Sequence, residues 1–316
     1  MIFPSIVFFG TPEFAAQILE FLIDHRVVIQ AIVTQPDRPK GRSLQLLPSA
    51  VKLCTQKKCP DVPIWQPEKC SDPTFLSHLA DVKADLFVVV AFGQILPQKL
   101  LDIPPLGCIN VHASLLPKYR GAAPIQRSIL NGDRETGIAI QKMVKQLDAG
   151  DVIAAKKVPI HEDTTSGELT QALCDAAKPL LLDVIARFAS GVPPATPQDV
   201  AHVTFAPKIE PEEGEIRWES SASVLHCKVR GMNPRPGAWC WINIQGEKKR
   251  LKIMRSKVVD RTGVPGTILS KDPLIVGCGE QALMILELQL EGKPRMQAAD
   301  WLRGMKGTLE FHDIAY

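Results

Sequence analysis

The first 190 residues alternate short apolar runs with segments of helical periodicity, and this alternation restricts the fold more than any other feature. The apolar runs lie near residues 5–10, 28–34, 63–65, 86–91 and 107–112. Helical patterns lie near residues 11–25, 49–58 and 74–82. Buried strands that alternate with helices are typical of a doubly wound parallel sheet. We therefore expect an α/β fold, with a further strand near residues 137–143 that extends the sheet.

The turn after the first apolar run argues against a dinucleotide site. A lone Gly10 is followed by Thr11 and Pro12, whereas the phosphate-binding fingerprint of such a fold needs Gly-x-Gly-x-x-Gly after the first strand. Thr11 is instead expected to be the N-cap of a helix, with the proline in its first turn. NAD binding is therefore disfavoured.

The second half of the chain has a different pattern. A long helix is expected from Thr165 or Ser166 to about Ala189, followed by a stretch rich in proline and charge with little periodicity. Short strand patterns separated by turn residues then favour a small β-barrel. The sequence thus predicts an α/β domain over residues 1–190, a semi-rigid linker over 191–212 and an OB-like β-barrel domain over 213–316.

Asn110 and His112 end the apolar run that begins at Gly107, and they are the strongest candidates for a reaction site. Because alternate side chains of a strand share a face, both should leave the carboxyl end of the sheet together, where open parallel sheets bind ligands. Asp148 follows in an Asp-x-Gly-Asp sequence. An amide, an imidazole and a carboxylate around one carbonyl would suit acyl transfer. A satisfied polar pair inside the core is the alternative.

Composition and cysteine spacing narrow the class of protein. Apolar residues make up 45% and charged residues 22%, which is typical of soluble globular proteins. No apolar run approaches the ~20 residues that span a bilayer, and the N-terminus does not resemble a signal or transit peptide. The eight cysteines include no Cys-x-x-Cys pair. We therefore expect a cytosolic protein with reduced thiols, no membrane association and no bound metal.

Positive charge is concentrated in the C-terminal part. Residues 213–316 hold 16 Lys and Arg against 12 Asp and Glu, whereas residues 1–212 hold 21 against 22. Six of the positive residues lie between Lys248 and Lys257. Such a cluster could face a polyanion, although a solvated strand face would look the same.

Asn-x-His, the following Ser-Leu-Leu-Pro-x-x-Arg-Gly-x-x-Pro and the downstream Asp-x-Gly-Asp resemble the pattern of the folate-dependent formyltransferases. The resemblance to the branch of this family that acts on initiator tRNA covers nearly the whole chain. It is carried by Phe8–Phe14, Thr34–Arg42, Ala91–Gln94 and Gly231–Gly237. Arg235 departs from the family, which usually has an aromatic residue there. The linker also has fewer lysines than many relatives.

The resemblance implies a reaction and its substrates. The donor would be 10-formyltetrahydrofolate, and the acceptor the α-amino group of methionine esterified to initiator tRNA. The Asn110 amide and the His112 imidazole would stabilise the tetrahedral oxyanion. Asp148 would orient His112, support its charged form and help to move a proton. A monomer is expected.

The resemblance also implies two groups of binding residues. Folate would contact the loop after the catalytic strand and the end of the neighbouring strand, that is Ser114, Leu115, Leu116, Pro117, Phe92, Gly93, Gln94, Ile95 and Leu96. For Phe92, Ile95 and Leu96, ordinary core packing remains an equal alternative. The tRNA would contact basic residues of the long loop after the second strand, the linker and the C-terminal domain, that is Arg42, Arg38, Lys40, Lys208, Lys248, Lys249 and Arg250. A mobile surface loop with incidental charge is the alternative for residues 35–48.

Two other functions stay open at this point. A formyltransferase of the same fold could act on a sugar amine or a small ribonucleotide amine, since the Asn-His-Asp site does not name the acceptor. A non-catalytic tRNA-binding protein could keep the fold without the chemistry. The basic loop and the basic C-terminal domain disfavour the first, and the intact Asn-His-Asp set disfavours the second.

Overall fold

The computed structural model describes residues 3–40, 45–304 and 309–312. The chain divides into two compact units. Unit 1 contains residues up to Gly121, Thr136–Val158 and Thr170–Ala206, and unit 2 contains Ala122–Glu135, Pro159–Leu169 and the chain from Pro207 onward. The short segments 122–135 and 159–169 thus group with the C-terminal part of the chain. These units are not continuous in sequence, whereas the predicted domains are, and the predicted boundaries stay a prediction.

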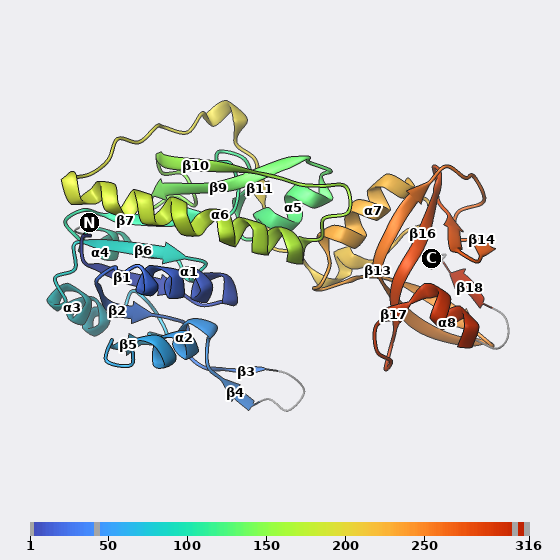
Figure 1. Cartoon of the computed structure of the whole chain (residues 1–316), viewed down its shortest axis with the longest axis horizontal. Coiled ribbons are helices and arrows are strands. Elements are labelled where there is room, and N and C mark those ends of the chain that lie inside the picture. Colours follow the sequence, from blue (N-terminus) through green and yellow to red (C-terminus); the bar gives the residue numbers. More distant parts are fainter. Residues whose placement is uncertain (1–2, 41–44, 305–308, 313–316) are drawn as a thin grey trace. The chain divides into compact units, whose positions relative to one another are not determined.

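Unit 1 is built on a mixed sheet whose described strands follow the order β10-β9-β7-β6-β1-β2-β5 (Figure 1). Their bounds are β1 Ile6–Gly10, β2 Ile29–Val33, β5 Ile64–Trp65, β6 Leu86–Val90, β7 Cys108–His112, β9 Glu135–Lys142 and β10 Val152–Pro159. The strands from β7 to β5 pair in parallel, and β9 pairs with β7 in the antiparallel direction. The predicted parallel sheet and the additional strand are therefore confirmed.

Helices pack against the sheet of unit 1. They are α1 Glu13–Asp24, α2 Ala50–Lys58, α3 Pro73–Asp81, α4 Gln98–Leu101 and, from Thr170 onward, α6 Ser166–Arg187. All five residues of β1 and all five of β6 are buried, which agrees with strands covered on both faces. On α1, Ala15, Ile18, Leu19 and Leu22 are buried, at the spacing of one helical face.

The predicted cap of α1 is wrong. Pro12 occupies the N-cap position and makes no side-chain cap hydrogen bond. The Thr11 hydroxyl instead donates to the carbonyl of Phe92 at 2.8 Å. The Thr11 hydroxyl does not cap α1 because the Phe92 carbonyl, just after the neighbouring strand β6, is within reach as an acceptor. This hydrogen bond joins the loops that follow β1 and β6 at the carboxyl edge of the sheet.

The insertion after β2 is not a structureless loop. Arg38–Lys40 (β3) and Gln45–Leu47 (β4) pair as an antiparallel hairpin, with Arg38 opposite Leu47 and Lys40 opposite Gln45. Leu46 and Leu47 are exposed. The sequence signal for a strand was weak here because a two-stranded ribbon has no buried face to impose an alternating pattern.

Residues 191–206 group with unit 1 and pair with its strands and loops. Thr196 and Val152 exchange backbone hydrogen bonds of 2.8 and 2.9 Å. Phe205–Ala206 (β11) pairs in parallel with Arg120–Gly121 (β8). Three short 3-10 turns lie in the surrounding chain, at Phe188–Ser190, Val200–His202 and Pro211–Gly214. Because residues 191–206 pair with other parts of unit 1 only at isolated points, their sequence shows no regular alternation of apolar and polar residues.

Unit 2 contains a near-closed antiparallel β-barrel. Its described strands follow the order β14-β15-β16-β13-β12-β18, and β17 pairs with β16. Their bounds are β12 Ala238–Ile244, β13 Glu247–Val259, β14 Ile268–Lys271, β15 Leu274–Gly277, β16 Ala282–Leu290, β17 Met296–Gln297 and β18 Leu309–His312, with helices α5 Pro124–Leu130, α7 Ala222–Gly231 and α8 Ala298–Gly304. Trp218 is fully buried and meets Phe311 edge to face at 5.4 Å. The expected β-barrel is confirmed.

Within the described ranges, the helices are all too short or too polar to cross a membrane.

Candidate functional site

The carboxyl end of β7 brings the three candidate catalytic residues together. Asn110 and His112 project from β7, and Asp148 lies in the loop after β9. The Asn110 Nδ2 donates to Asp148 Oδ1 at 3.4 Å, and His112 Nδ1 lies 3.6 Å from the same oxygen. Asp148 and His112 are nearly buried, with side chains 12% and 6% exposed. The expected proximity of these groups is confirmed.

The Asp148 carboxylate is held by two further donors. Gln141 lies opposite Asn110 in the β7–β9 pairing, and its Nε2 donates to Asp148 Oδ1 at 2.9 Å. The backbone N–H of Gly121 donates to Oδ2 at 2.9 Å. Because an ionised carboxylate only accepts hydrogen bonds, this set of donors fits the charged form.

His112 has an acceptor on each side of its ring. The Tyr119 carbonyl lies 2.9 Å from Nε2, and a carbonyl oxygen only accepts, so Nε2 carries a proton. Nδ1 is then the nitrogen on the side of Asp148 and the reacting groups. A doubly protonated ring would satisfy both acceptors, whereas the neutral ring leaves Nδ1 as an acceptor.

Two glycines allow the close approaches of backbone around Asp148. A Cβ on Gly150 would lie 1.7 Å from the carbonyl oxygen of Lys142, so the loop can approach β9 only with glycine there. Gly121, which donates to Asp148, has a φ of +123°, and its Cβ would lie 2.8 Å from the Ala206 carbonyl oxygen. Asp148 itself adopts a left-handed φ of +47°.

The loop after β7 offers an apolar surface next to these groups. The buried Ser114 hydroxyl donates to the Lys118 carbonyl at 2.6 Å, which fixes the shape of the loop. Leu115, Leu116 and Pro117 are each half-buried. This exposure leaves part of each side chain free to contact a ligand.

The predicted folate residues after β6 divide into two groups. Phe92 and Leu96 are buried in the core, where Phe92 meets Phe9 edge to face at 5.5 Å. Any contact that these two make with folate therefore depends on their backbone. Gly93 and Ile95 are exposed, Ile95 at 87%. Ile95 is thus the apolar side chain of this set that a ligand can reach.

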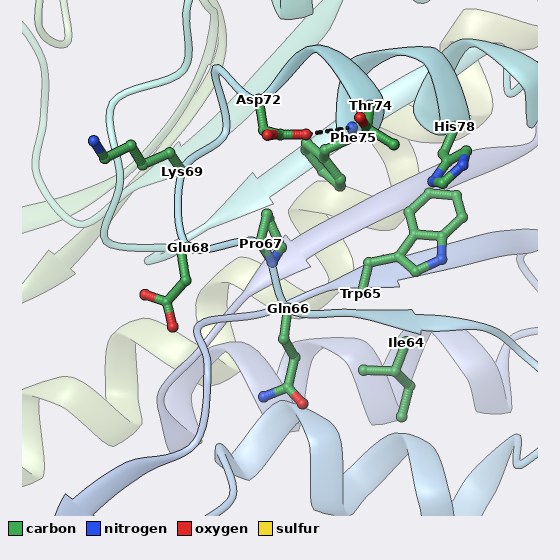
Figure 2. A pocket seen from close by; sticks show the side chains of 10 residues that line it. All are labelled: Ile64, Trp65, Gln66, Pro67, Glu68, Lys69, Asp72, Thr74, Phe75 and His78. Carbon is green, nitrogen blue, oxygen red and sulfur yellow. Dashed lines mark hydrogen bonds between the residues drawn. The ribbon is translucent and has the colours of Figure 1, made fainter.

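Gln94 uses its side chain to hold a neighbouring loop. Its Nε2 donates to the Pro67 carbonyl at 3.1 Å, and its Oε1 accepts from the Cys70 N–H at 3.0 Å. Residues of this loop line an open cavity of about 470 Å³ beside β5 and α3 (Figure 2). The cavity is lined by Ile64, Trp65, Gln66, Pro67, Glu68, Lys69, Asp72, Thr74, Phe75 and His78, so it is distinct from the Asn110, His112 and Asp148 group.

The structure adds residues that the sequence analysis did not single out. Gln141 and the Tyr119 carbonyl contact Asp148 and His112 directly. Gln198 contacts the backbone of the Asp148 loop from the proline-rich segment. Gln141 could have been found, because it is a buried polar residue at the end of an apolar strand. A backbone carbonyl and a glutamine in an irregular segment give no such signal.

The hairpin places one of the three predicted basic residues of the insertion. Arg38 forms an exposed ion pair with Glu68 at 2.8 Å. Lys40 ends β3, and Arg42 lies outside the described residues. The partner of Arg38 lowers the net positive charge of this part of the hairpin.

One outward face of the barrel interleaves cations and indoles. The register of β12 and β13 sets Trp239 opposite Lys252 and Trp241 opposite Arg250, while the alternate residues form the buried core. The Arg250 guanidinium lies 3.9 Å from the Trp239 ring centre, and Lys248 Nζ lies 4.7 Å from that of Trp241. Burial, then the charges of Arg250 and Arg235, lowers the pKa of Lys252. This combination of aromatic and positive side chains suits nucleic acid.

The other predicted basic residues do not lie on this outward face beside the indoles. Lys249 alternates with Lys248 along β13, so it points to the opposite side of the strand, and it pairs with Glu247 at 2.7 Å. Lys208 is exposed, and its Nζ lies 3.6 Å from Glu210 Oε1. The sequence cluster at 248–257 is therefore divided between two faces.

Two family models match the chain. The model described as formyl transferase matches residues 5–185. The model described as formyl transferase, C-terminal domain, matches residues 208–306.

Relatives and solved structures agree with these matches. The chain is 53% identical to a methionyl-tRNA formyltransferase of Protochlamydia amoebophila, over 97% of each chain. It is 43% identical to that of Chlamydia abortus over 96% of each. Among solved structures, an N-formyltransferase of Helicobacter canadensis, in complex with folinic acid and dTDP-3-aminofucose, superimposes with a TM-score of 0.66 at 16% identity, covering 90% of this chain and 99% of that one. HypX of Aquifex aeolicus with tetrahydrofolic acid gives 0.65 at 16% identity, over 99% of this chain and 51% of that one.

Proposed function

The chain belongs to the formyl transferase family and, within it, to the methionyl-tRNA formyltransferases, and we propose that Asn110, His112 and Asp148 perform its reaction with 10-formyltetrahydrofolate as the donor. The enzyme formylates the methionine carried by initiator tRNA. The observation that supports the proposed site is the convergence of one amide, one imidazole and one carboxylate at the end of β7.

In the proposed reaction the α-amino nitrogen bonds to the formyl carbon, and the bond from that carbon to N10 of the folate breaks. The amine loses one proton, and the departing folate nitrogen gains one. A free α-amino group has a pKa of about 8, and the adjacent ester lowers this pKa, so much of the amine is already neutral at neutral pH. The larger demand is to stabilise the charge of the tetrahedral intermediate.

Asn110 and His112 would meet that demand. The Asn110 amide and His112 Nδ1 both lie beside Asp148. Because Nε2 already donates to the Tyr119 carbonyl, His112 would donate to the oxyanion from Nδ1 as the doubly protonated ring. Removal of one such donor costs roughly 3–4 kcal/mol in well-studied acyl-transfer sites. Asp148, fixed by Gln141 and Gly121, would stabilise the imidazolium and accept the proton in transit.

The folate would lie against the loop after β7. Half-buried Leu115, Leu116 and Pro117 and exposed Ile95 fit the flat faces of a pterin ring, and the backbone at Gly93 can approach the polar edge of such a ring closely because it has no side chain. Ser114 would act by holding the loop, since its hydroxyl is already bonded to Lys118. Phe92, Gln94 and Leu96 would shape this pocket from behind.

The tRNA would be held by the basic face of unit 2, with Lys248 and Arg250 as its charged contacts. Lys208 would add a further exposed charge. Arg38, Lys40 and Arg42 remain proposed contacts of the hairpin. Binding through phosphates predicts an affinity for tRNA that falls with salt.

A single assay separates this proposal from formylation of a small amine. The purified protein is mixed with 10-formyltetrahydrofolate and with methionyl-tRNA of the initiator type, methionyl-tRNA of the elongator type, or an amino sugar nucleotide. Formylmethionine on initiator tRNA is expected, at a rate far above that of the other two acceptors. Formylation of the sugar alone, or failure of this donor to support any transfer, would reject the proposal.

A further inference from the structure

Gln198 reaches the loop that carries Asp148 from the proline-rich segment after α6. Its Nε2 donates to the carbonyl oxygens of Asp148 and Gly150 at 2.8 and 2.7 Å. Its Oε1 accepts from Nε and Nη2 of Arg120 at 3.1 and 2.8 Å. One side-chain amide therefore joins the loop after β9 to the loop after β7.

The orientation of this amide is determined by its partners. Carbonyl oxygens only accept hydrogen bonds, and the Arg120 guanidinium only donates them. A reversed amide would set its oxygen against two carbonyls and its NH₂ against a cation, and all four bonds would be lost. The set of contacts thus requires both the donor and the acceptor of a glutamine.

The backbone on each side of Gln198 is anchored to unit 1. Thr196 exchanges two hydrogen bonds with Val152, the first residue of β10. Thr204 accepts from the Tyr119 N–H at its hydroxyl and from the Arg120 N–H at its carbonyl, both at 2.9 Å. Since the main chain is held at both ends, little conformational freedom is lost when the side chain bonds to the Asp148 loop.

Asp148 needs support of this kind. It adopts a left-handed φ of +47° although it carries a Cβ, and such strain persists only where neighbouring groups enforce it. Gln141 and Gly121 hold its carboxylate, while Gln198 holds its carbonyl. The two sets of bonds together determine where the carboxylate lies relative to His112.

We propose that Gln198 is a positioning residue for formyl transfer, which holds the Asp148 loop so that the carboxylate stays beside Asn110 and His112. This inference rests on the proposed role of Asp148. In the described part of the chain, the hydrogen bonds of Gln198 go to the Asp148 loop, Gln141 and Arg120, and not to Asn110 or His112. Its link to the three catalytic residues is therefore made at the Asp148 loop.

Two variants separate the two ends of the amide. Gln198→Ala removes every bond. Gln198→Glu keeps an acceptor for Arg120 but sets a carboxylate oxygen against the Asp148, Gly150 and Gln141 oxygens, so it removes the bonds on the Asp148 side and keeps the link to Arg120. Asp199→Ala is the matched control, because this exposed neighbour contacts only the following turn, through the Ala201 N–H and the His202 ring.

Steady-state kinetics and folate binding are measured for each variant below its thermal midpoint. Gln198→Glu is expected to lower kcat about tenfold or more, since a small displacement of a catalytic group has effects of this size, while the KM for folate stays within about twofold. Gln198→Ala is expected to lower kcat at least as much. Asp199→Ala should keep native kcat. Native kcat in both Gln198 variants would overturn the inference.

A double-mutant cycle with Asp148→Asn distinguishes positioning from general loss of structure. If Gln198 acts through Asp148, Gln198→Glu costs little further rate once the carboxylate is gone. An equal further loss in the Asp148→Asn background would overturn the inference, because the contribution of Gln198 would then be independent of Asp148. Near-native turnover of Asp148→Asn alone would instead contradict the proposed function itself.

Discussion

At the scale of single residues, the position of the Asp148 carboxylate depends on the glycine that follows it in the same loop. Its carboxylate is reached by Asn110 and His112 only because the chain turns sharply between Asp148 and Asp151, and this turn depends on a missing side chain. The space that a Cβ of Gly150 would need is already taken by the Lys142 carbonyl. The Asp-x-Gly-Asp sequence is thus a steric requirement as well as a signature.

Gly150→Ala is expected to destabilise the protein and to slow formyl transfer. A Cβ 1.7 Å from a carbonyl oxygen forces the loop away from β9, and overpacking of this kind costs roughly 1–3 kcal/mol or more. Urea unfolding and the formylation assay measure the two effects. Gly304→Ala is the control, because among the described residues its Cβ would meet nothing within 4 Å. A Gly150→Ala protein with native stability and turnover would refute this explanation of the loop.

At the scale of elements, the start of α6 combines a capping box with an ion pair. The Thr165 N–H and hydroxyl donate to Glu168 Oε2 at 2.9 and 2.8 Å, and Glu168 also pairs with Arg255. Desolvation raises the pKa of Glu168, but the backbone bond from Thr165, the Arg255 guanidinium and the Thr165 hydroxyl outweigh it and lower the pKa to about 2.

This lowered pKa predicts how stability depends on pH. A carboxyl whose pKa is lower in the folded state stabilises the protein fully above its ordinary value of 4.5, and the contribution is lost as the pH falls toward 2. Glu168→Gln should therefore destabilise the protein at pH 7, by up to about 1 kcal/mol because the pair is half exposed. Urea unfolding at pH 7 and pH 3 should show this difference shrinking in acid. A difference that grows in acid would contradict the assignment.

The alternation of β13 makes a prediction about two adjacent lysines. Lys248 lies over Trp241 on the outward face, whereas Lys249 lies on the other side and pairs with Glu247. Lys248→Ala should raise the KM for tRNA several-fold. It should also reduce the slope of the logarithm of the binding constant against the logarithm of salt concentration by about one. Lys249→Ala, the matched control, should have a much smaller effect. Equal effects of the two substitutions would contradict the proposal that the outward face is the one that contacts tRNA.

How much the sequence could predict depends on whether an element has a buried face. The apolar runs of β1 and β6 predicted the parallel sheet, because strands covered on both faces must be apolar throughout. Asn110 and His112 could be placed together from the two-residue repeat of a strand. The pairing of β3 with β4 and the backbone pairing of the segment at 191–206 were not predicted, because neither buries a regular face. Gln198 could not be found for the same reason.

At the scale of the whole molecule, the two compact units defined by contacts within the chain differ from the continuous domains that the composition of the sequence predicted. Ala122–Glu135 and Pro159–Leu169 belong to the same compact unit as the barrel, so neither unit is a continuous stretch of sequence. Leu130 of α5 packs on the core of unit 2, and Arg127 holds Glu213 in the same unit at 2.6 Å. Composition detects a proline-rich stretch, but it cannot detect short segments that leave one unit to complete another.

The central claim is that Asn110, His112 and Asp148 carry the chemistry while other residues bind the substrates. The most direct test measures formyl transfer to initiator methionyl-tRNA, at saturating concentrations of both substrates, for the native protein, His112→Ala and Asp148→Asn, together with folate binding by each. Both variants should lose at least about 100-fold in turnover, the usual scale for general acid–base groups, while their folate dissociation constants stay near the native value. Near-native turnover of either purified variant would contradict the claim.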